Sequence, residues 1–213
     1  MPPKPSQRLI QRAMKHEKLP VGLGQEAIGL LEMDQAVVSD LAECLLSIDT
    51  DEILWGLIFS AGLANAGKIP SALLPSVISC IRSALASEHN RLREEAMRPM
   101  VILRDYFPDY RTLMLKAMTD SYWGVRNVAL GSCRTFLGSR EIEPLLSFAN
   151  DPYAIEESMR GHLTYIFRDR ALELIEEMLG RVFRSGRISE MTEAGPVSWR
   201  DWKPFLDWYR KHR

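Results

Sequence analysis

The 213-residue chain has few of the residues that build disulfide frameworks, metal sites and sheets. Its three cysteines, Cys44, Cys80 and Cys133, are odd in number and far apart in the sequence. That spacing excludes a disulfide framework and a paired-cysteine zinc motif, and it is typical of a protein in a reducing compartment. Aromatic residues make up only 8% of the chain. No stretch shows the two-residue alternation of a half-buried strand, so we expect an all-α protein.

The chain also lacks an excess of charge of either sign. Lys and Arg total 27 and Asp and Glu total 28, which gives a formal net charge of −1. A protein that binds nucleic acid or an anionic membrane usually carries a clear basic excess, so the balance disfavours both partners. The longest apolar stretch, residues 53–67, is shorter than the ~20 residues of a membrane span. We expect it to form a buried helix in a cytoplasmic protein that does not enter a membrane.

Signatures of catalysis and of cofactor binding are missing as well. The four histidines share no metal-ligand spacing with one another or with the cysteines. Gly22-Leu23-Gly24 follows no predicted strand, which excludes a nucleotide-binding loop there. The chain contains no Walker sequence and no nucleophile elbow. The sequence therefore predicts no cofactor, no metal and no catalytic residue.

The chain does contain a helical pattern that recurs. Residues 113–138 predict two helices separated by a break, and the second helix contains Val125-Arg126. Leu92-Arg93 stands 33 residues earlier in an equivalent pattern. Asp151-Pro152 stands 31 residues after Asp120 and is expected to begin another helix, because proline is tolerated at the first helical position. Helical pairs that recur at this period are typical of an α-solenoid.

The pattern Asp120-x4-Val125-Arg126-x2-Ala129-Leu130 resembles HEAT repeats, particularly the short bacterial HEAT-like type, and the resemblance is best over residues 70–170. It implies a right-handed α-solenoid superhelix of about five helical pairs. It also implies that the Asp of the turn and the Arg that follows Val connect neighbouring repeats. The residues with this expected structural role are Asp120, Arg126, Arg93 and Asp151.

We expect four segments along the chain. Residues 1–19 form a basic segment with a short helix, residues 20–185 the HEAT-like solenoid, residues 186–197 a loop, and residues 198–213 a C-terminal aromatic helix. The helical spacing of Arg8 and Arg12 is also compatible with a targeting segment. Ser198 and Asp201 fit a capping box at the start of the last helix.

The C-terminal helix carries an aromatic series with two interpretations. One is a cap, because the open apolar end of a solenoid would otherwise aggregate. The other is an anchor for a partner, because tryptophan is enriched in binding hot spots. The series is Trp199, Trp202, Phe205 and Trp208.

In HEAT solenoids the second helices line the concave surface, so their outward residues are candidates for binding. At 100° per residue, helical geometry predicts which residues point outward. They are Glu94, Arg98, Asn127, Gly131, Arg134, Glu157, Gly161, Thr164 and Arg168. The mixture of charges favours a protein or peptide over DNA. Gly131 and Gly161 hold equivalent positions, where a missing side chain allows either close helix packing or close approach of a partner.

The sequence thus predicts a non-catalytic protein-interaction module, an adaptor or regulator that binds a protein or peptide in its concave groove. Two alternatives come from other HEAT-like proteins. One is an alkylpurine DNA glycosylase, whose Trp and Asp residues are weakly matched by Asp120, Trp123 and Arg126. The other is a bilin-lyase-like protein that acts on chromophore proteins, for which no residue argues either way.

Overall fold

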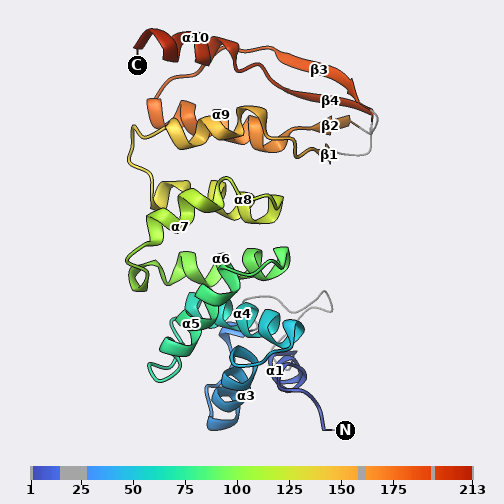
Figure 1. The fold of residues 1–213 in the computed structure, drawn as a ribbon, viewed down its shortest axis with the longest axis vertical. Helices are drawn as coiled ribbons and strands as arrows, with labels where there is room; N and C mark the ends of the chain where they lie inside the picture. The colour runs from blue at the N-terminus through green and yellow to red at the C-terminus, as the bar shows by residue number, and fades with distance from the viewer. Residues whose placement is uncertain (1, 15–27, 158–161, 193–194, 213) are drawn as a thin grey trace. The chain divides into compact units, whose positions relative to one another are not determined.

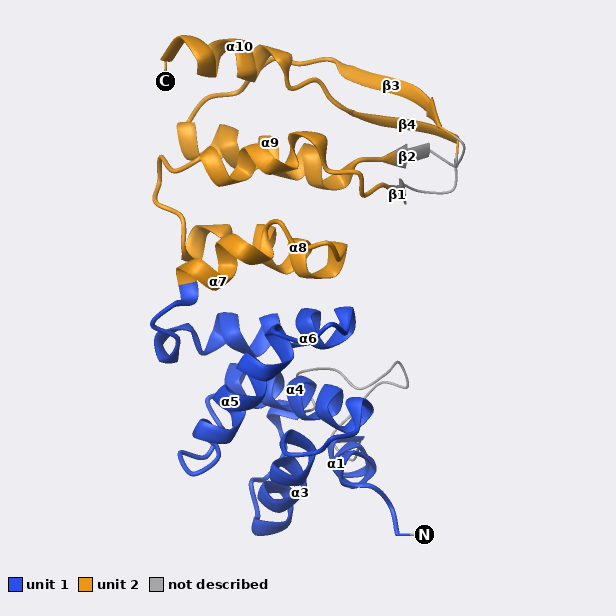
Figure 2. Cartoon of the chain, viewed as in Figure 1, with its two compact units in different colours: residues 1–110 blue, residues 111–213 orange. Residues whose placement is uncertain are grey.

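The computed structural model describes residues 2–14, 28–157, 162–192 and 195–212, and it is mostly helical (Figure 1). The chain divides into two compact units, residues 1–110 and residues 111–213 (Figure 2). The prediction of a mostly helical protein is confirmed. The prediction that strands are absent is wrong, because the second unit contains a small four-stranded sheet.

The first unit consists of helices that pack both on chain neighbours and on helices further along the chain. Its elements are α1 (Pro5–Met14), α3 (Gln35–Leu45), α4 (Thr50–Asn65), α5 (Leu74–Leu85), α6 (Asn90–Ile102) and the short 3-10 helix η1 (Arg104–Tyr106). Helix α3 packs on α1 and α4, and α6 packs on α4 and α5.

Helix α4 is the buried helix that the apolar stretch predicts. It begins after Asp49, whose side chain accepts a hydrogen bond from the backbone N–H of Asp51 at 2.9 Å. Leu57, Phe59 and Leu63 are fully buried. At Gly56 a Cβ atom would lie 3.3 Å from the Cβ of Cys44, so the absence of a side chain lets α3 and α4 approach closely.

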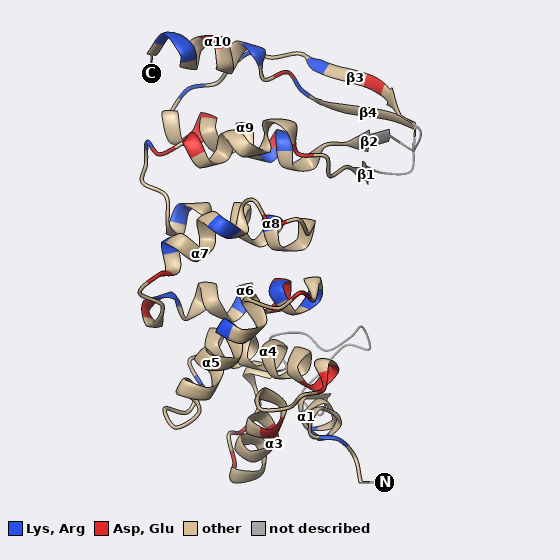
Figure 3. Cartoon of the chain, viewed as in Figure 1, with Lys and Arg blue, Asp and Glu red and all other residues tan. Residues whose placement is uncertain are grey.

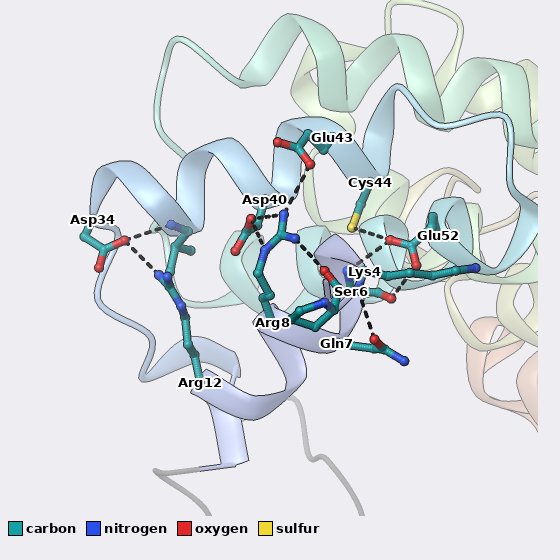
Figure 4. Close-up of polar contacts among 12 residues, drawn as sticks. Lys4, Ser6, Gln7, Arg8, Arg12, Asp34, Asp40, Glu43, Cys44 and Glu52 are labelled. Atoms are coloured by element: carbon teal, nitrogen blue, oxygen red, sulfur yellow. Dashed lines mark hydrogen bonds and ion pairs between the residues drawn. The ribbon is translucent and has the colours of Figure 1, made fainter. Parts of the chain in front are cut away.

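The N-terminal helix α1 is held by a buried carboxylate at the start of α4 (Figure 4). Glu52 accepts hydrogen bonds from the backbone N–H of Ser6 at 3.0 Å and from its hydroxyl at 2.6 Å. The thiol of Cys44 donates to the same carboxylate at 3.4 Å. Burial alone would raise the pKa of Glu52, but the hydrogen bonds from Ser6 and Cys44 outweigh burial and hold the pKa below its usual value of 4.5.

Ion pairs attach the solvent side of the same helix (Figure 4). Arg8 contacts Asp40 at 2.6 Å and Glu43 at 3.2 Å, and Arg12 contacts Asp34 at 3.1 Å. The predicted basic N-terminal helix is therefore present as α1, and both of its arginines bind acids in or next to α3.

The second unit combines helices with a sheet. Its elements are α7 (Tyr110–Ala117), which begins at the unit boundary, α8 (Trp123–Gly131), η2 (Cys133–Thr135), η3 (Glu143–Asn150), β1 (Ile155–Glu157), β2 (His162–Thr164), α9 (Ile166–Leu179), β3 (Arg187–Thr192), β4 (Gly195–Arg200) and α10 (Lys203–His212). The strand order is β1-β2-β4-β3. The pairs β1–β2 and β3–β4 are antiparallel, and β2–β4 is parallel. Helix α9 packs against η3 and β4.

Three local predictions in this unit are wrong. Asp151-Pro152 does not begin a helix, since Asp151 is extended and β1 follows it. Its carboxylate accepts a tertiary contact from Arg126 instead of capping a helix. Residues 186–197 are mostly strand rather than loop, and β4 includes Ser198, so the last helix begins at Lys203. There Asp201 accepts the backbone N–H of Lys203 at 2.9 Å, in place of the predicted Ser198 cap.

In the part of the chain that the structure describes, no helix is both long and apolar enough to cross a membrane.

The buried position of Glu52 generates a test of the first unit. We expect Glu52→Gln to lower the free energy of unfolding by about 1–3 kcal/mol, because Ser6 loses a charged acceptor in a buried site. The matched control is Glu43→Gln, which removes an exposed acid that also contacts α1 and should cost less than about 1 kcal/mol. Urea denaturation measures both variants, and equal losses would contradict the role of Glu52.

The lowered pKa of Glu52 also sets a direction for the pH dependence. A carboxylate whose pKa is lower in the folded state adds stability above its unfolded pKa, 4.5, and that stability disappears as the pH falls through the folded value. We therefore expect the stability difference between wild type and Glu52→Gln to be constant near neutral pH and to shrink below pH 4.5. Denaturation curves at a series of pH values measure this difference.

Candidate functional site

The buried guanidinium of Arg126 organises the second unit around helix α8. Its Nε lies 2.7 Å from Oδ2 of Asp151, and its Nη2 donates to Oδ1 at 3.1 Å. Its Nη1 donates to the backbone carbonyls of Asp120 and Ser121 at 2.9 and 3.0 Å. Only 8% of Arg126 is exposed, and such a bidentate pair is among the strongest hydrogen-bonded contacts of an arginine. The contact connects the turn before α8 to the segment before β1.

Arg93, 33 residues earlier in α6, makes a similar backbone contact in the first unit. Its Nη1 donates to the carbonyls of Ser87 and Glu88 at 3.0 and 3.1 Å, and these residues stand at the same offsets as Asp120 and Ser121 from Arg126. The hydroxyl of Ser87 accepts the backbone N–H of residue 89 at 3.1 Å. Asp120 accepts the N–H of residue 122 at 2.8 Å in the same way. The recurring sequence pattern thus corresponds to a recurring local turn structure.

An aromatic stack continues from Arg126 to the surface. The ring of Trp123 lies parallel to that of Tyr153, with 4.7 Å between centroids and 8° between planes. Tyr153 stacks on the buried ring of Phe167 at 5.1 Å, and the guanidinium of Arg126 lies 5.7 Å from the centre of Phe167. Trp123 is 36% exposed. An indole is therefore presented to solvent in an orientation that the stack fixes.

Trp123 belongs to a surface formed by α8, η2 and α9, which we name the α8–α9 face. Asn127 follows Trp123 by one helical turn, and its side-chain oxygen accepts a hydrogen bond from Arg170 at 3.4 Å. Arg134 forms an ion pair with Glu177. The face consists of Trp123, Asn127, Gly131, Arg134, Arg170, Glu173 and Glu177. Its two arginines and two glutamates give it no net charge, and both colours are visible on these helices in Figure 3.

A cleft lies at the end of this face that contains Arg134, away from Trp123. Its volume is about 370 Å³, and it is lined by Arg134, Leu137, Gly138, Ser139, Glu177 and Met178. Leu137 is buried and Met178 is half-buried, so apolar groups stand beside the Arg134–Glu177 ion pair.

At Gly131, α8 carries no side chain where Arg170 of α9 approaches. A Cβ atom there would lie 3.2 Å from Nη2 of Arg170. Arg170 is exposed and its side chain is long and flexible, so it can move aside at little cost. The structure thus places Gly131 at a contact between neighbouring helices and also at the surface, and both interpretations of this glycine stay open.

The other predicted groove residues belong to several different elements. Glu94 and Arg98 form an ion pair along α6, in the first unit, at 3.7 Å. Glu157 lies in β1, and Gly161 lies outside the described residues. Thr164 is buried in β2. The expected helix through residues 152–166 is wrong at Glu157 and Thr164, which lie in strands, and a strand turns its residues differently from a helix.

Arg168 lies in α9 but takes part in packing. Its guanidinium carbon is 3.7 Å from the centre of the Tyr165 ring and 4.8 Å from that of Trp199. Its Nε donates to the carbonyl of Asp151 at 2.9 Å. Arg168 therefore joins the start of α9 to β4 and to the segment that Arg126 binds.

The C-terminal aromatic residues pack inward within the second unit. Phe205 is fully buried, and its ring lies 5.3 Å from Phe183 and 5.7 Å from Tyr209. Trp202 is buried and donates its indole N–H to the carbonyl of Arg168 at 3.2 Å. Trp208 lies 5.3 Å from Phe183, and Trp199 is half-buried in β4. Burial of Phe205 and Trp202 favours the cap over the anchor, because an anchor must reach solvent.

The sequence interpretation missed Arg170, Glu173 and Glu177. Their spacing of three and four residues in a helix is the signal that could have found them, since such residues share one side. The sequence predicts a helix that begins at Pro152, whereas α9 begins at Ile166, so the predicted outward residues include Arg168 of α9 but not these three. Tyr153 was missed because a lone aromatic after a proline carries no pattern.

No protein-family model and no curated protein compared with this chain matches it. Within residues 2–14, 28–157, 162–192 and 195–212, no group of three or more His, Cys, Asp or Glu side chains is arranged to hold a metal ion.

The Arg126–Asp151 contact generates a prediction about stability. We expect Arg126→Ala to lower the free energy of unfolding by about 3–5 kcal/mol, because it leaves the carboxylate of Asp151 buried without its main partner. Arg126→Lys should lie between wild type and alanine, because lysine keeps the charge but cannot bind both oxygens in the same plane. Thermal and urea unfolding measure the three proteins.

Arg134→Ala is the matched control in the same unit. It removes an exposed arginine from an ion pair with Glu177 and should cost less than about 1 kcal/mol. If Arg126→Ala is no more destabilising than this control, the buried contact does not hold the unit together.

Proposed function

We propose that this chain is a non-catalytic protein-interaction module, an adaptor or regulator, and that the α8–α9 face binds a protein or peptide. The observation that carries the proposal is the exposed indole of Trp123, held by the stack on Tyr153 and Phe167. Tryptophan is enriched in binding hot spots, and an aromatic side chain that is already immobile loses little entropy on binding. The proposal keeps the HEAT-like solenoid as its framework, supported by the similar contacts of Arg93 and Arg126.

The charge and shape of the face favour a peptide over nucleic acid. Its balanced charges offer no net attraction to a phosphate backbone, which needs a basic surface. Helix α8 extends about 12 Å from Trp123 to Gly131, and Arg134 follows in η2. An extended peptide of about five residues spans that length, so one side chain can contact Trp123 while another enters the cleft beside Arg134.

The glycosylase alternative has no specific support in the second unit. Arg126 is buried on Asp151, and Oδ1 of Asp120 accepts the backbone N–H of Tyr122.

The proposal includes a cytoplasmic location, because Cys44, Cys80 and Cys133 are all free thiols.

The proposal predicts that two variants of the face lose the partner. Trp123→Ala removes the anchor, and Gly131→Arg displaces Arg170 and places a long side chain across the face. We expect each variant to weaken binding at least about tenfold, the effect of about 1.4 kcal/mol. Affinity capture from nuclease-treated lysate identifies a stoichiometric partner, and calorimetry with that partner measures the affinities.

The matched control is Arg210→Ala, which changes an exposed arginine of α10 in the same unit. It should bind like wild type, and thermal unfolding must show that all variants fold. A partner that binds both face variants as tightly as wild type would place the site elsewhere. Retention of nucleic acid alone, when nuclease is omitted, would favour a nucleic-acid-binding protein.

A further inference from the structure

Strand β3 forms an open edge of the sheet in the second unit. The strand order ends with β3, which pairs only with β4 among the described residues (Figure 1). Its first five residues are exposed, and they include Ile188 at 39% and Met191 at 79%. The strand contains neither proline nor lysine, which commonly protect an edge from pairing with another strand. Its two charged side chains are both engaged within the unit, Arg187 with Asp169 at 3.1 Å and Glu190 with the hydroxyl of Tyr165 at 3.4 Å.

The register of β3 on β4 shows which backbone groups point outward. In an antiparallel pair, successive residues direct their N–H and C=O groups alternately toward the partner strand and away from it. Gly186 accepts the N–H of Asp201 across the pair at 2.9 Å, so Arg187 directs its backbone groups outward, as do Ser189 and Met191. The same alternation holds on β4. Ser198 lies opposite Ser189, and its backbone carbonyl accepts the N–H of Tyr165, so it points away from β3 and toward the β2 side.

We infer that β3 is the site where two copies of this chain associate, by antiparallel pairing of β3 with β3 about a two-fold axis through Ser189. A two-fold axis perpendicular to the sheet keeps each face of the sheet continuous and makes the interface self-complementary. In this register Ser189 lies opposite Ser189 of the second copy, and Arg187 lies opposite Met191. All outward N–H and C=O groups of the three residues then find partners.

Neighbouring registers are worse. A shift by two residues in either direction places one of the three outward residues of each copy opposite a residue outside β3. A shift toward the C-terminus also places Glu190 opposite Glu190, and like charges directly opposite each other are destabilising. In the register centred on Ser189, Glu190 lies opposite Ile188, and no like charges are opposed. Charge and hydrogen bonding therefore select the same alignment.

Cross-linking tests the register. Oppositely placed residues of a hydrogen-bonded pair have Cα atoms about 5.5 Å apart, within the range of about 4.4–6.8 Å that a disulfide spans. We expect Ser189→Cys to form a disulfide dimer under mild oxidation. The matched control is Glu190→Cys, whose thiols would be diagonal neighbours about 7–8 Å apart and should not cross-link. The natural cysteines are buried and do not compete.

Sedimentation at tens of micromolar tests the association itself. The wild-type chain should show twice the mass of the monomer, and Ser189→Lys should be monomeric, because two ammonium groups would face each other at the axis. A wild-type chain that stays monomeric would overturn the inference. The edge would then be available for pairing with an extended segment of another protein. Equal cross-linking of the two cysteine variants would also overturn it, because random collision explains that result.

Discussion

The buried guanidinium of Arg126 constrains the segments around it. The condition is that a charge removed from water must be paired and hydrogen-bonded. The second unit meets the condition with acceptors from two segments, the carbonyls of Asp120 and Ser121 and both carboxylate oxygens of Asp151. These segments come before α8 and before β1. The contact therefore determines where α8 begins and how the chain continues toward the sheet.

The proposed binding surface depends on that contact. Asp151 adopts an extended conformation and accepts the backbone N–H of Tyr153, which places the tyrosine ring between Trp123 and Phe167. The carbonyl of Asp151 accepts Arg168, which ties α9 to the same segment. Helix α9 then lies where Arg170 reaches Asn127 and Glu177 reaches Arg134. A buried ion pair thus supports an exposed polar face.

Local signals in the sequence predicted much of the helical part. Apolar composition identified α4, and the recurring Val-Arg and Leu-Arg pairs identified the turns of Arg126 and Arg93. The sheet could not be predicted in the same way. Strands β1 and β2 have three residues each, and β3 is exposed along nearly its whole length, so none shows alternation. Asp151-Pro152 carries the sequence of a helix start, but a tertiary contact with Arg126 uses the capping carboxylate. Local sequence does not report such competition.

The most direct test of this central contact is a double-mutant cycle of Arg126→Ala and Asp151→Ala, with the free energy of unfolding measured by urea denaturation. If the guanidinium and the carboxylate stabilise the second unit as a pair, the two changes are not additive. The double variant should then be more stable than the sum of the single losses predicts, by more than about 1.5 kcal/mol. Additivity within about 0.5 kcal/mol would show that the two residues act independently and would contradict the organising role of Arg126.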